Sequence, residues 1–488
     1  MVSVLMKGYD LNHDIYELLK VFFPNEDINQ IHCSNDYTEG ILIDFTLEKI
    51  GDSLYGVTKQ YNDKKLLSDS KENIDDIYIK RNKEKSIRIG VKKSLYNAII
   101  STSEKEVPWG ILTGIRPSKI VHELMEKDTS KEVMMDILTK EYKLSSEKAN
   151  LIIDISYKQM QYLYPVDRNK YSLYVGIPFC PTRCIYCSFA SLPVGKYNKY
   201  IDEYVEKLIY EIKSIKRIMS NKKINTVYIG GGTPTSIPVN SLKSIIESIY
   251  DCFGIENINE FTVEAGRPDT INYEVLKMLR EQNITRISIN PQTMNDKTLK
   301  LIGRNHTSED IIRAYRMARD VGFTNINMDL IAGLPGEGIP EMKNTLIELE
   351  RLDPENITIH TLAVKRGSEY KEHRDNFDIK NQDLIKSMLK ETRDYASKNN
   401  LEPYYLYRQK QILGNAENIG YSKPGYECIY NISIMEEKET IIGAGVGSTT
   451  KIYEPNGNKL ERIFNFKDLK EYINRIDELI DRKRKLFK

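Results

Sequence analysis

The chain has 488 residues, 40% of them hydrophobic and 29% charged, which is the composition of a globular protein too long for one compact core. Its 71 basic and 70 acidic residues leave a formal net charge of +1, so bulk charge gives no support for binding to nucleic acid or to an anionic membrane. No run of 18 apolar residues indicates a membrane span, and the polar first residues do not resemble a signal peptide, so we expect a cytoplasmic protein.

Residues 1–165 are predicted to form an α+β N-terminal domain. Asn12 can cap a helix over residues 13–23, and alternating apolar residues predict strands at 40–47, 54–60 and 86–91. A segment punctuated by Gly and Pro, residues 107–119, leads into helices predicted near 117–126, 129–140 and 145–163. It contains the single tryptophan, Trp109, and we expect a loop that packs on the next domain.

Residues 166–400 repeat a pattern of strand, loop and helix. Strands are predicted at 172–177, 226–230, 260–264, 286–290, 325–331 and 356–361, and helices near 197–218, 239–253, 272–283, 308–322, 340–352 and 381–398. Six such units predict an α/β fold, an open partial (β/α)6 TIM-like barrel with its helices outside. The active face of this barrel should be the rim formed by the carboxyl ends of the strands.

Residues 401–488 are predicted to form a C-terminal cap and a tail helix. The Tyr- and Gly-rich stretch 401–465 is interpreted as a cap over the barrel mouth. The tail, residues 466–487, has the pattern of an amphipathic helix and ends in the basic run 482–485. We expect this run to be a solvated face and assign it no partner.

Three cysteines with the spacing C-x3-C-x2-C, Cys180, Cys184 and Cys187, follow the first barrel strand. Three thiolates can hold three irons of a cubane cluster and leave the fourth iron open to a chelating molecule. A zinc site is the first alternative, but it needs a fourth ligand, and Cys252 and His306 lie far away in sequence. A disulfide is the second alternative, and it would leave one cysteine over.

Polar residues or glycines end every predicted barrel strand. They are the cysteine motif, Gly230-Gly-Gly-Thr-Pro234, Glu264, Gln292, Asp329 and His360. The glycine turn lets backbone approach a ligand closely, and a strand-end carboxylate such as Glu264 would suit ribose hydroxyls. The alternative for Glu264 is an ion pair with Arg267. Gln292, Arg304 and Asp329 could form a second polar shell.

The cysteine motif resembles that of the radical SAM superfamily, in which S-adenosylmethionine chelates the open iron of a [4Fe–4S] cluster. The segments Ile177-Pro-Phe-Cys180, Gly230–Thr235, Pro291-Gln-Thr293 and Asp329-Leu-Ile-Ala-Gly-Leu-Pro335 resemble oxygen-independent coproporphyrinogen III oxidases (dehydrogenases). The N-terminal domain, Gly114–Lys119 and Tyr405–Lys410 resemble the HemZ branch of that family. The resemblance implies that the cluster-bound S-adenosylmethionine contacts Tyr174, Tyr186, Gly231 and Glu264. It implies a possible second S-adenosylmethionine at Gly232, Thr233, Gln292, Arg304, Asp329 and Ala363.

Two positions depart from the family pattern. Gly176 stands where the oxidases carry His before Ile-Pro-Phe-Cys, and Ser188-Phe189 follows Cys187 in place of a further cysteine. The Cys-Ser-Phe ending is closer to the heme-chaperone branch, which shares the fold.

By this resemblance the expected function is the conversion of coproporphyrinogen III propionates to vinyl groups in heme biosynthesis. An electron donor such as flavodoxin or ferredoxin and an unidentified electron acceptor are the implied partners. Tyr174, Arg366 and Arg408 are the candidate catalytic residues, and Lys365 and Lys410 are further cations for the substrate's carboxylates. The alternatives are a heme chaperone or heme-modifying protein and a non-catalytic iron–sulfur redox protein. The glycine turn and Glu264 argue against the last, because a redox protein needs neither.

Overall fold

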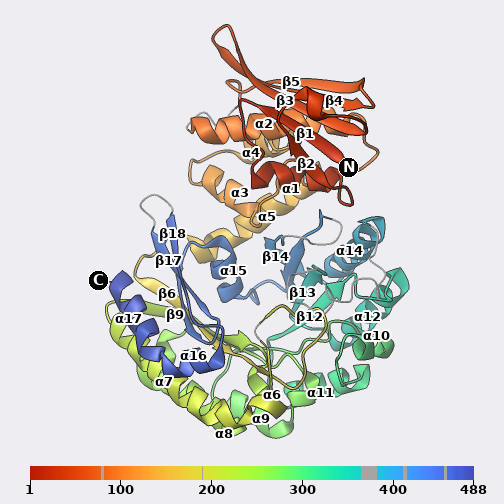
Figure 1. Ribbon diagram of the computed structural model, residues 1–488. Coiled ribbons are helices and arrows are strands. Elements are labelled where there is room, and N and C mark those ends of the chain that lie inside the picture. The colour runs from red at the N-terminus through yellow and green to blue at the C-terminus, as the bar shows by residue number, and fades with distance from the viewer. Residues whose placement is uncertain (78–81, 190, 364–381, 410–414, 455–458, 488) are drawn as a thin grey trace. The chain divides into compact units, whose positions relative to one another are not determined.

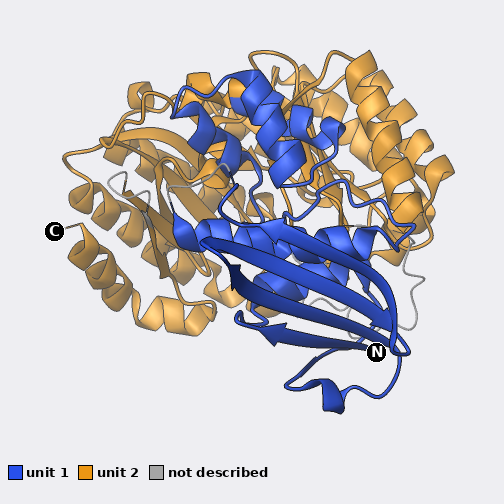
Figure 2. Ribbon diagram, turned by 90° about the horizontal axis from the view of Figure 1, so that it is seen from above, with its two compact units in different colours: residues 1–156 blue, residues 157–488 orange. Residues whose placement is uncertain are grey.

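The computed structural model describes residues 1–77, 82–189, 191–363, 382–409, 415–454 and 459–487. The chain forms two compact units, unit 1 over Met1–Ser156 and unit 2 over Tyr157–Lys488 (Figure 2). The cysteine motif lies in unit 2.

Unit 1 is built on a five-stranded sheet with the order β2-β1-β3-β4-β5. Its strands are β1 (Val2–Lys7), β2 (Ile28–Ile31), β3 (Ile41–Ile50), β4 (Ser53–Asn62) and β5 (Lys65–Asn73). Its helices are α1 (His13–Phe22), α2 (Lys83–Ile100), α3 (Ser118–Met125), α4 (Lys131–Asp136) and α5 (Ser146–Leu163), the last of which continues into unit 2. Asn12 caps α1, because its side chain accepts a hydrogen bond from the backbone of Ile15.

The strand predicted at 86–91 is wrong, because these residues lie inside helix α2. Their short alternation of apolar and polar residues suggested a strand, but over the full helix the buried residues Val91, Leu95 and Ile99 recur every fourth position. That face of α2 belongs to the core that contains Val4 and Phe45 of the sheet. Trp109 is buried within unit 1, where the ammonium of Lys148 lies 5.7 Å from its ring centre.

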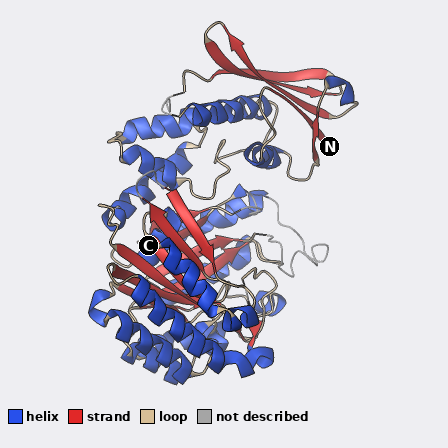
Figure 3. Cartoon of the chain, turned by 60° about the vertical axis from the view of Figure 1, so that its left-hand side comes forward, coloured by secondary structure: helices blue, strands red, loops and turns tan. Residues whose placement is uncertain are grey.

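Unit 2 contains the expected six parallel strands, which form the open barrel (Figures 1 and 3). In sheet order they are β13 (Asn356–Thr361), β12 (Ile326–Ala332), β11 (Arg286–Ser288), β10 (Glu260–Glu264), β9 (Lys223–Gly231) and β6 (Lys170–Ile177). Most of their residues are buried, because helices cover the outer face, whereas residues such as Tyr228, Glu264 and Asp329 are half-buried. A two-stranded pair, β7 (Phe179–Cys180) and β8 (Leu192–Pro193), follows β6.

The helices of the barrel pack outside the sheet (Figure 1). The long ones are α7 (Ile201–Ile218), α8 (Val239–Phe253), α9 (Tyr273–Glu281), α11 (Ser308–Asp320), α12 (Ile339–Leu352) and α14 (Gln382–Lys398), and the short ones are α6 (Val194–Tyr197) and α10 (Asp296–Leu301). Each long helix buries one apolar stripe; in α8 it contains Leu242, Ile245 and Ile249. The six long helices agree with the sequence prediction.

Residues 401–465, which we expected as a cap, instead lengthen the sheet at both edges. β15 (Asn418–Ser422) pairs antiparallel with β13, and β14 (Glu402–Tyr407) pairs with β15. At the other edge β16 (Thr440–Gly445) pairs parallel with β6 and is followed by β17 (Thr449–Glu454) and β18 (Lys459–Phe464).

The helix between these strands, α15 (Ile429–Glu436), lies at the amino end of the barrel and not over its active rim. The Glu260 carboxylate, at the start of β10, accepts hydrogen bonds from the backbone N–H groups of Ile429 and Tyr430 at 2.9 and 3.0 Å. It thereby satisfies two donors at the start of α15. The first turn of α15 is therefore fixed at the end opposite to the cysteine motif.

The C-terminal tail forms two helices, α16 (Leu469–Asn474) and α17 (Ile476–Leu486), which contact α7. The expectation that the whole basic run is solvated is wrong for Lys483, whose side chain is 1% exposed. It forms an ion pair with the fully buried Glu211 of α7 and donates to the Gly443 carbonyl at 2.5 Å. The same carboxylate accepts from Gly445 N–H, Asn465 and Tyr472, so the tail is part of the core.

Among the described helices, none is long and apolar enough to cross a membrane.

Candidate active site

The three motif cysteines lie on one loop that begins at the carboxyl end of β6 and β7. Cys180 and Cys184 are buried, Cys187 is half-buried, and all three are free thiols. The backbone N–H of Cys187 donates to the Cys184 carbonyl at 3.0 Å, which holds the last two cysteines in one turn. The disulfide alternative therefore has no support in the structure.

The thiols are not arranged around a single ion. In the part of the chain that the structure describes, no three His, Cys, Asp or Glu side chains are grouped tightly enough to hold one metal ion. A cubane cluster places each thiolate on a different iron, so its ligands stand further apart than those of one ion. Three thiolates on one loop are the ligand set that a cubane cluster with one open iron requires.

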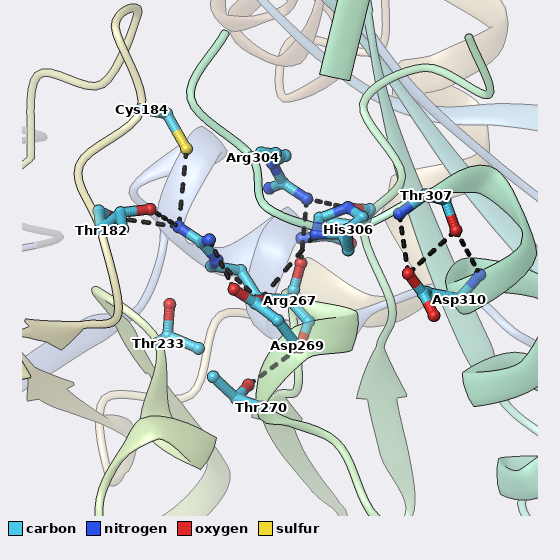
Figure 4. A network of polar contacts seen from close by, with 12 residues as sticks. Thr182, Cys184, Thr233, Arg267, Asp269, Thr270, Arg304, His306, Thr307 and Asp310 are labelled. Atoms are coloured by element: carbon cyan, nitrogen blue, oxygen red, sulfur yellow. Dashed lines mark hydrogen bonds and ion pairs between the residues drawn. The ribbon is translucent and has the colours of Figure 1, made fainter. Parts of the chain in front are cut away.

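Two barrel loops hold the cysteine loop in place (Figure 4). From the loop after β10, Arg267 donates to the carbonyl oxygen of Thr182 at 2.9 Å and lies 3.9 Å from the Cys184 sulfur. From the loop after β11 and α10, the Gly303 carbonyl accepts the Thr182 hydroxyl at 3.1 Å. Arg267 forms its ion pair with Asp269, not with Glu264, so the alternative reading of Glu264 is wrong.

The glycine turn at the end of β9 packs directly on the cysteine loop. Gly231 has a φ of +112°, which strains any residue with a side chain. A Cβ at Gly232 would lie 2.9 Å from the Cys180 sulfur, so only glycine fits there. The next residue, Thr233, places its hydroxyl 3.5 Å from the same sulfur. The turn can therefore present backbone to a ligand beside the cysteines.

Glu264 ends β10 inside the barrel and accepts a hydrogen bond from the hydroxyl of Tyr228 at 2.7 Å. Burial raises the pKa of Glu264 to about 7, although the Tyr228 hydrogen bond opposes this. Tyr228 stacks on Tyr430 of α15, with ring centres 4.5 Å apart, and Tyr174 lies about 6 Å from both rings. The sequence analysis did not identify Tyr228 as a site residue. The signal that could have indicated it is its position two residues before the glycine turn.

The residues expected in a second polar shell are linked through Asn290, whose side chain accepts from the backbone N–H of Asp329 at 3.3 Å and whose carbonyl accepts from Arg304 at 2.6 Å. Asp329 accepts from Asn327 at 2.7 Å and lies 3.8 Å from the imidazole of His360. Burial raises the pKa of Asp329, but the hydrogen bonds from His360 and Asn327 outweigh it and hold the pKa below its usual value. Tyr407, another residue that the sequence did not reveal, contacts His360 from β14 at 3.1 Å.

Gln292 comes from the loop after β11, and Arg304 comes from the loop after α10. Gln292 has a φ of +67°, and its backbone bonds to Asp329 and Ile331 of β12. Arg304 is buried and donates to the Asn290 carbonyl at 2.6 Å. Interactions with Tyr186 and Cys184 keep the pKa of Arg304 raised against the effect of burial. Arg304 and Tyr186 therefore lie at the cysteine loop.

The candidate substrate residues are described only in part. Ala363 is the last described residue after β13, and Lys365, Arg366 and Lys410 lie outside the described residues. Arg408 follows β14, is 4% exposed and donates to the Ala416 carbonyl at 3.4 Å. Burial lowers its pKa to about 10, opposed by Glu417. Contact of Arg366 or Arg408 with a substrate stays a prediction.

Comparisons with known proteins identify a superfamily and several relatives that this chain resembles. A sequence model of the Radical SAM superfamily matches residues 174–349. The oxygen-independent coproporphyrinogen-III oxidase-like protein HemZ of Bacillus subtilis is 43% identical over 381 residues, which is 77% of this chain and 76% of HemZ. The heme chaperone HemW of Lactococcus lactis is 31% identical over 56% of this chain and 68% of its own. The solved structure of coproporphyrinogen III oxidase (HemN) from Escherichia coli superposes with a TM-score of 0.52 at 23% identity, over 66% of this chain and 72% of HemN.

Proposed function

Because the chain belongs to the radical SAM superfamily, and within it to the family of HemZ and HemN, we propose that it oxidatively decarboxylates coproporphyrinogen III. Two of the four propionates would become vinyl groups, which yields protoporphyrinogen IX. Members of this superfamily use a [4Fe–4S] cluster and S-adenosylmethionine.

The residues of the site fit both groups. Cys180, Cys184 and Cys187 would each bind one iron and leave the fourth iron without a protein ligand. The turn at Gly231 would present its backbone to the methionyl end of S-adenosylmethionine, and Glu264 would accept hydrogen bonds from the ribose. A Cβ at Gly230 would lie 2.8 Å from the Glu264 carboxyl carbon, so the absence of a side chain keeps this space clear. A second S-adenosylmethionine near Gln292, Arg304 and Asp329 is part of the proposal.

The chemistry divides between the bound groups and the chain. When bound, the cluster and S-adenosylmethionine supply a radical that abstracts hydrogen. The proposed reaction removes one hydrogen atom from a propionate carbon, releases the carboxylate as carbon dioxide and passes one electron to an acceptor. The chain would position the reactants and exclude water, and the stacked rings of Tyr174, Tyr228 and Tyr430 would serve the exclusion of water. A donor such as flavodoxin or ferredoxin would provide the reducing electron.

One observation carries the proposal: the similarity to HemZ extends well beyond the superfamily region. The superfamily sequence model ends at residue 349, whereas the alignment with HemZ spans 77% of the chain. The superfamily region holds the cluster cysteines and most of the residues proposed for S-adenosylmethionine, so a match that extends beyond it supports a function nearer to that of HemZ than membership of the superfamily alone does. This supports a tetrapyrrole as substrate.

A second candidate is a heme chaperone, which one feature of the cysteine loop favours. Ser188 and Phe189 follow Cys187, and Phe189 is 66% exposed. An exposed large aromatic ring beside a metal-binding loop could lie against the face of a bound heme. In this case the chain would bind heme without turnover.

Anaerobic turnover with mass-spectrometric product analysis tests the two candidates against each other. The full chain, with its cluster reconstituted, is incubated with dithionite, S-adenosylmethionine and coproporphyrinogen III. We expect carbon dioxide release and a product lighter by two carboxyl groups and two hydrogen atoms. Cleavage of S-adenosylmethionine without vinyl product, together with stoichiometric heme binding by absorption, would replace the enzyme with the chaperone.

A further inference from the structure

Arg267 is a buried arginine, and a carboxylate holds one side of its guanidinium group in place. Its side chain is 4% exposed, three residues beyond Glu264 on the loop after β10. Its Nε and Nη2 donate to the two Asp269 oxygens at 2.9 and 2.7 Å, a bidentate pair. This pair sets the plane of the guanidinium, so the direction of the remaining nitrogen is fixed as well.

The remaining nitrogen, Nη1, points at the cysteine loop (Figure 4). It lies 2.9 Å from the Thr182 carbonyl oxygen, 3.0 Å from the Thr182 hydroxyl oxygen and 3.9 Å from the Cys184 sulfur. Thr182 stands between Cys180 and Cys184, and its hydroxyl donates onward to Gly303. One guanidinium therefore fixes both the backbone before Cys184 and the sulfur itself.

We propose that Arg267 is a positioning residue that sets the place of Cys184 and makes the cluster easier to reduce. Adding an electron to a cluster increases the negative charge on its sulfurs, so a cationic donor at one thiolate stabilises the reduced form more than the oxidised form. Asp269 offsets part of this effect because it places a negative charge on the far side of the same guanidinium. The two residues thus act on the potential with opposite signs.

A merely structural ion pair would not need this geometry. Burying an Arg and an Asp costs solvation that their attraction often only just repays. Here the arginine also bonds to the loop that carries the cysteines. The inference concerns the cluster and holds for any substrate, so it does not depend on coproporphyrinogen.

The test is a redox titration of the reconstituted full chain, followed by electron paramagnetic resonance, with iron content measured alongside. Arg267→Met keeps a long side chain and removes the donors. We expect its cluster to be harder to reduce, with the reduction equilibrium changed on the order of tenfold, which is about 59 mV for one electron. Asp269→Asn keeps Arg267 and removes the counter-charge, and it should shift the potential in the opposite direction.

Arg286→Met is the matched control. Arg286 is buried in the same barrel, but it begins β11 at the amino end of the sheet and donates to the Tyr426 carbonyl and to Asn325. Its loss should leave the potential unchanged. If Arg267→Met alone failed to hold iron, the positioning role would be supported, and Asp269→Asn would decide the effect on the potential. An unchanged potential in both Arg267→Met and Asp269→Asn, or a shift of the same sign in both, would overturn the proposal.

Discussion

At the scale of single residues, Glu264 makes stability depend on pH. Its pKa of about 7 in the folded chain exceeds the ordinary value of 4.5, so the folded state retains the proton longer than the unfolded state. The stability from this group is complete below pH 4.5 and is lost as pH rises through 7. Glu264→Gln stays neutral, so we expect it to gain thermal stability over the wild type as pH rises from about 5 to about 8. The largest expected gain in the free energy of unfolding is about 3 kcal/mol.

Calorimetric unfolding of both proteins across this range measures the effect. Glu206→Gln, which changes an exposed carboxyl of helix α7, is the control. A Glu264→Gln difference that stays constant with pH would show that the carboxyl of Glu264 is ionised throughout.

At the scale of elements, helix α17 is held to the barrel by the buried ion pair between Lys483 and Glu211. Apolar residues of similar volume could fill the same space. Lys483→Met leaves the carboxylate of Glu211 buried without its cation, and we expect a loss of about 3–5 kcal/mol in the free energy of unfolding. The double variant Glu211→Gln/Lys483→Met should recover part of this, because no unpaired charge remains. Lys485→Met, in the exposed part of the same helix, is the control. Urea unfolding that fails to distinguish Lys483→Met from Lys485→Met would contradict the buried pair.

At the scale of the whole molecule, cluster binding should depend on three of the six cysteines. Changing Cys180, Cys184 or Cys187 to Ala should abolish stable binding of about four irons per chain, because each thiolate holds one corner. Cys33, Cys252 and Cys428 should be dispensable for iron; Cys428 lies 3.4 Å from Glu260 at the other end of the barrel. The iron content of the six single-cysteine variants, measured after anaerobic reconstitution, tests both expectations. A requirement for Cys252 or Cys428 would mean that no iron is left open.

The sequence was sufficient to predict features that depend on neighbouring residues. The six strands, their helices, the cysteine motif and the polar strand ends follow from short periodic patterns and fixed spacings. The strand predicted at 86–91 failed because a six-residue window can follow the strand period inside a helix. Arg267, Tyr228 and Lys483 could not be assigned, since their partners lie 83, 36 and 272 positions away. The edge strands were missed for the same reason: their pairing is decided by register with β6 and β13.

The pairing of β6 with β16 has a consequence for the order of events during synthesis. Residues 170–177 leave the ribosome long before residues 440–445, so one edge of the first barrel strand waits for most of unit 2 to be made. Tyr430, which stacks in the barrel interior, emerges shortly before β16, and Lys483 emerges about 40 residues after it. The nascent chain therefore carries an unfinished apolar sheet for some time, which favours slow folding and a need for chaperones. Since the cysteine loop follows β6 directly, we expect the loop to reach its final shape only after residues 440–445 have emerged and paired, and iron to be inserted after that.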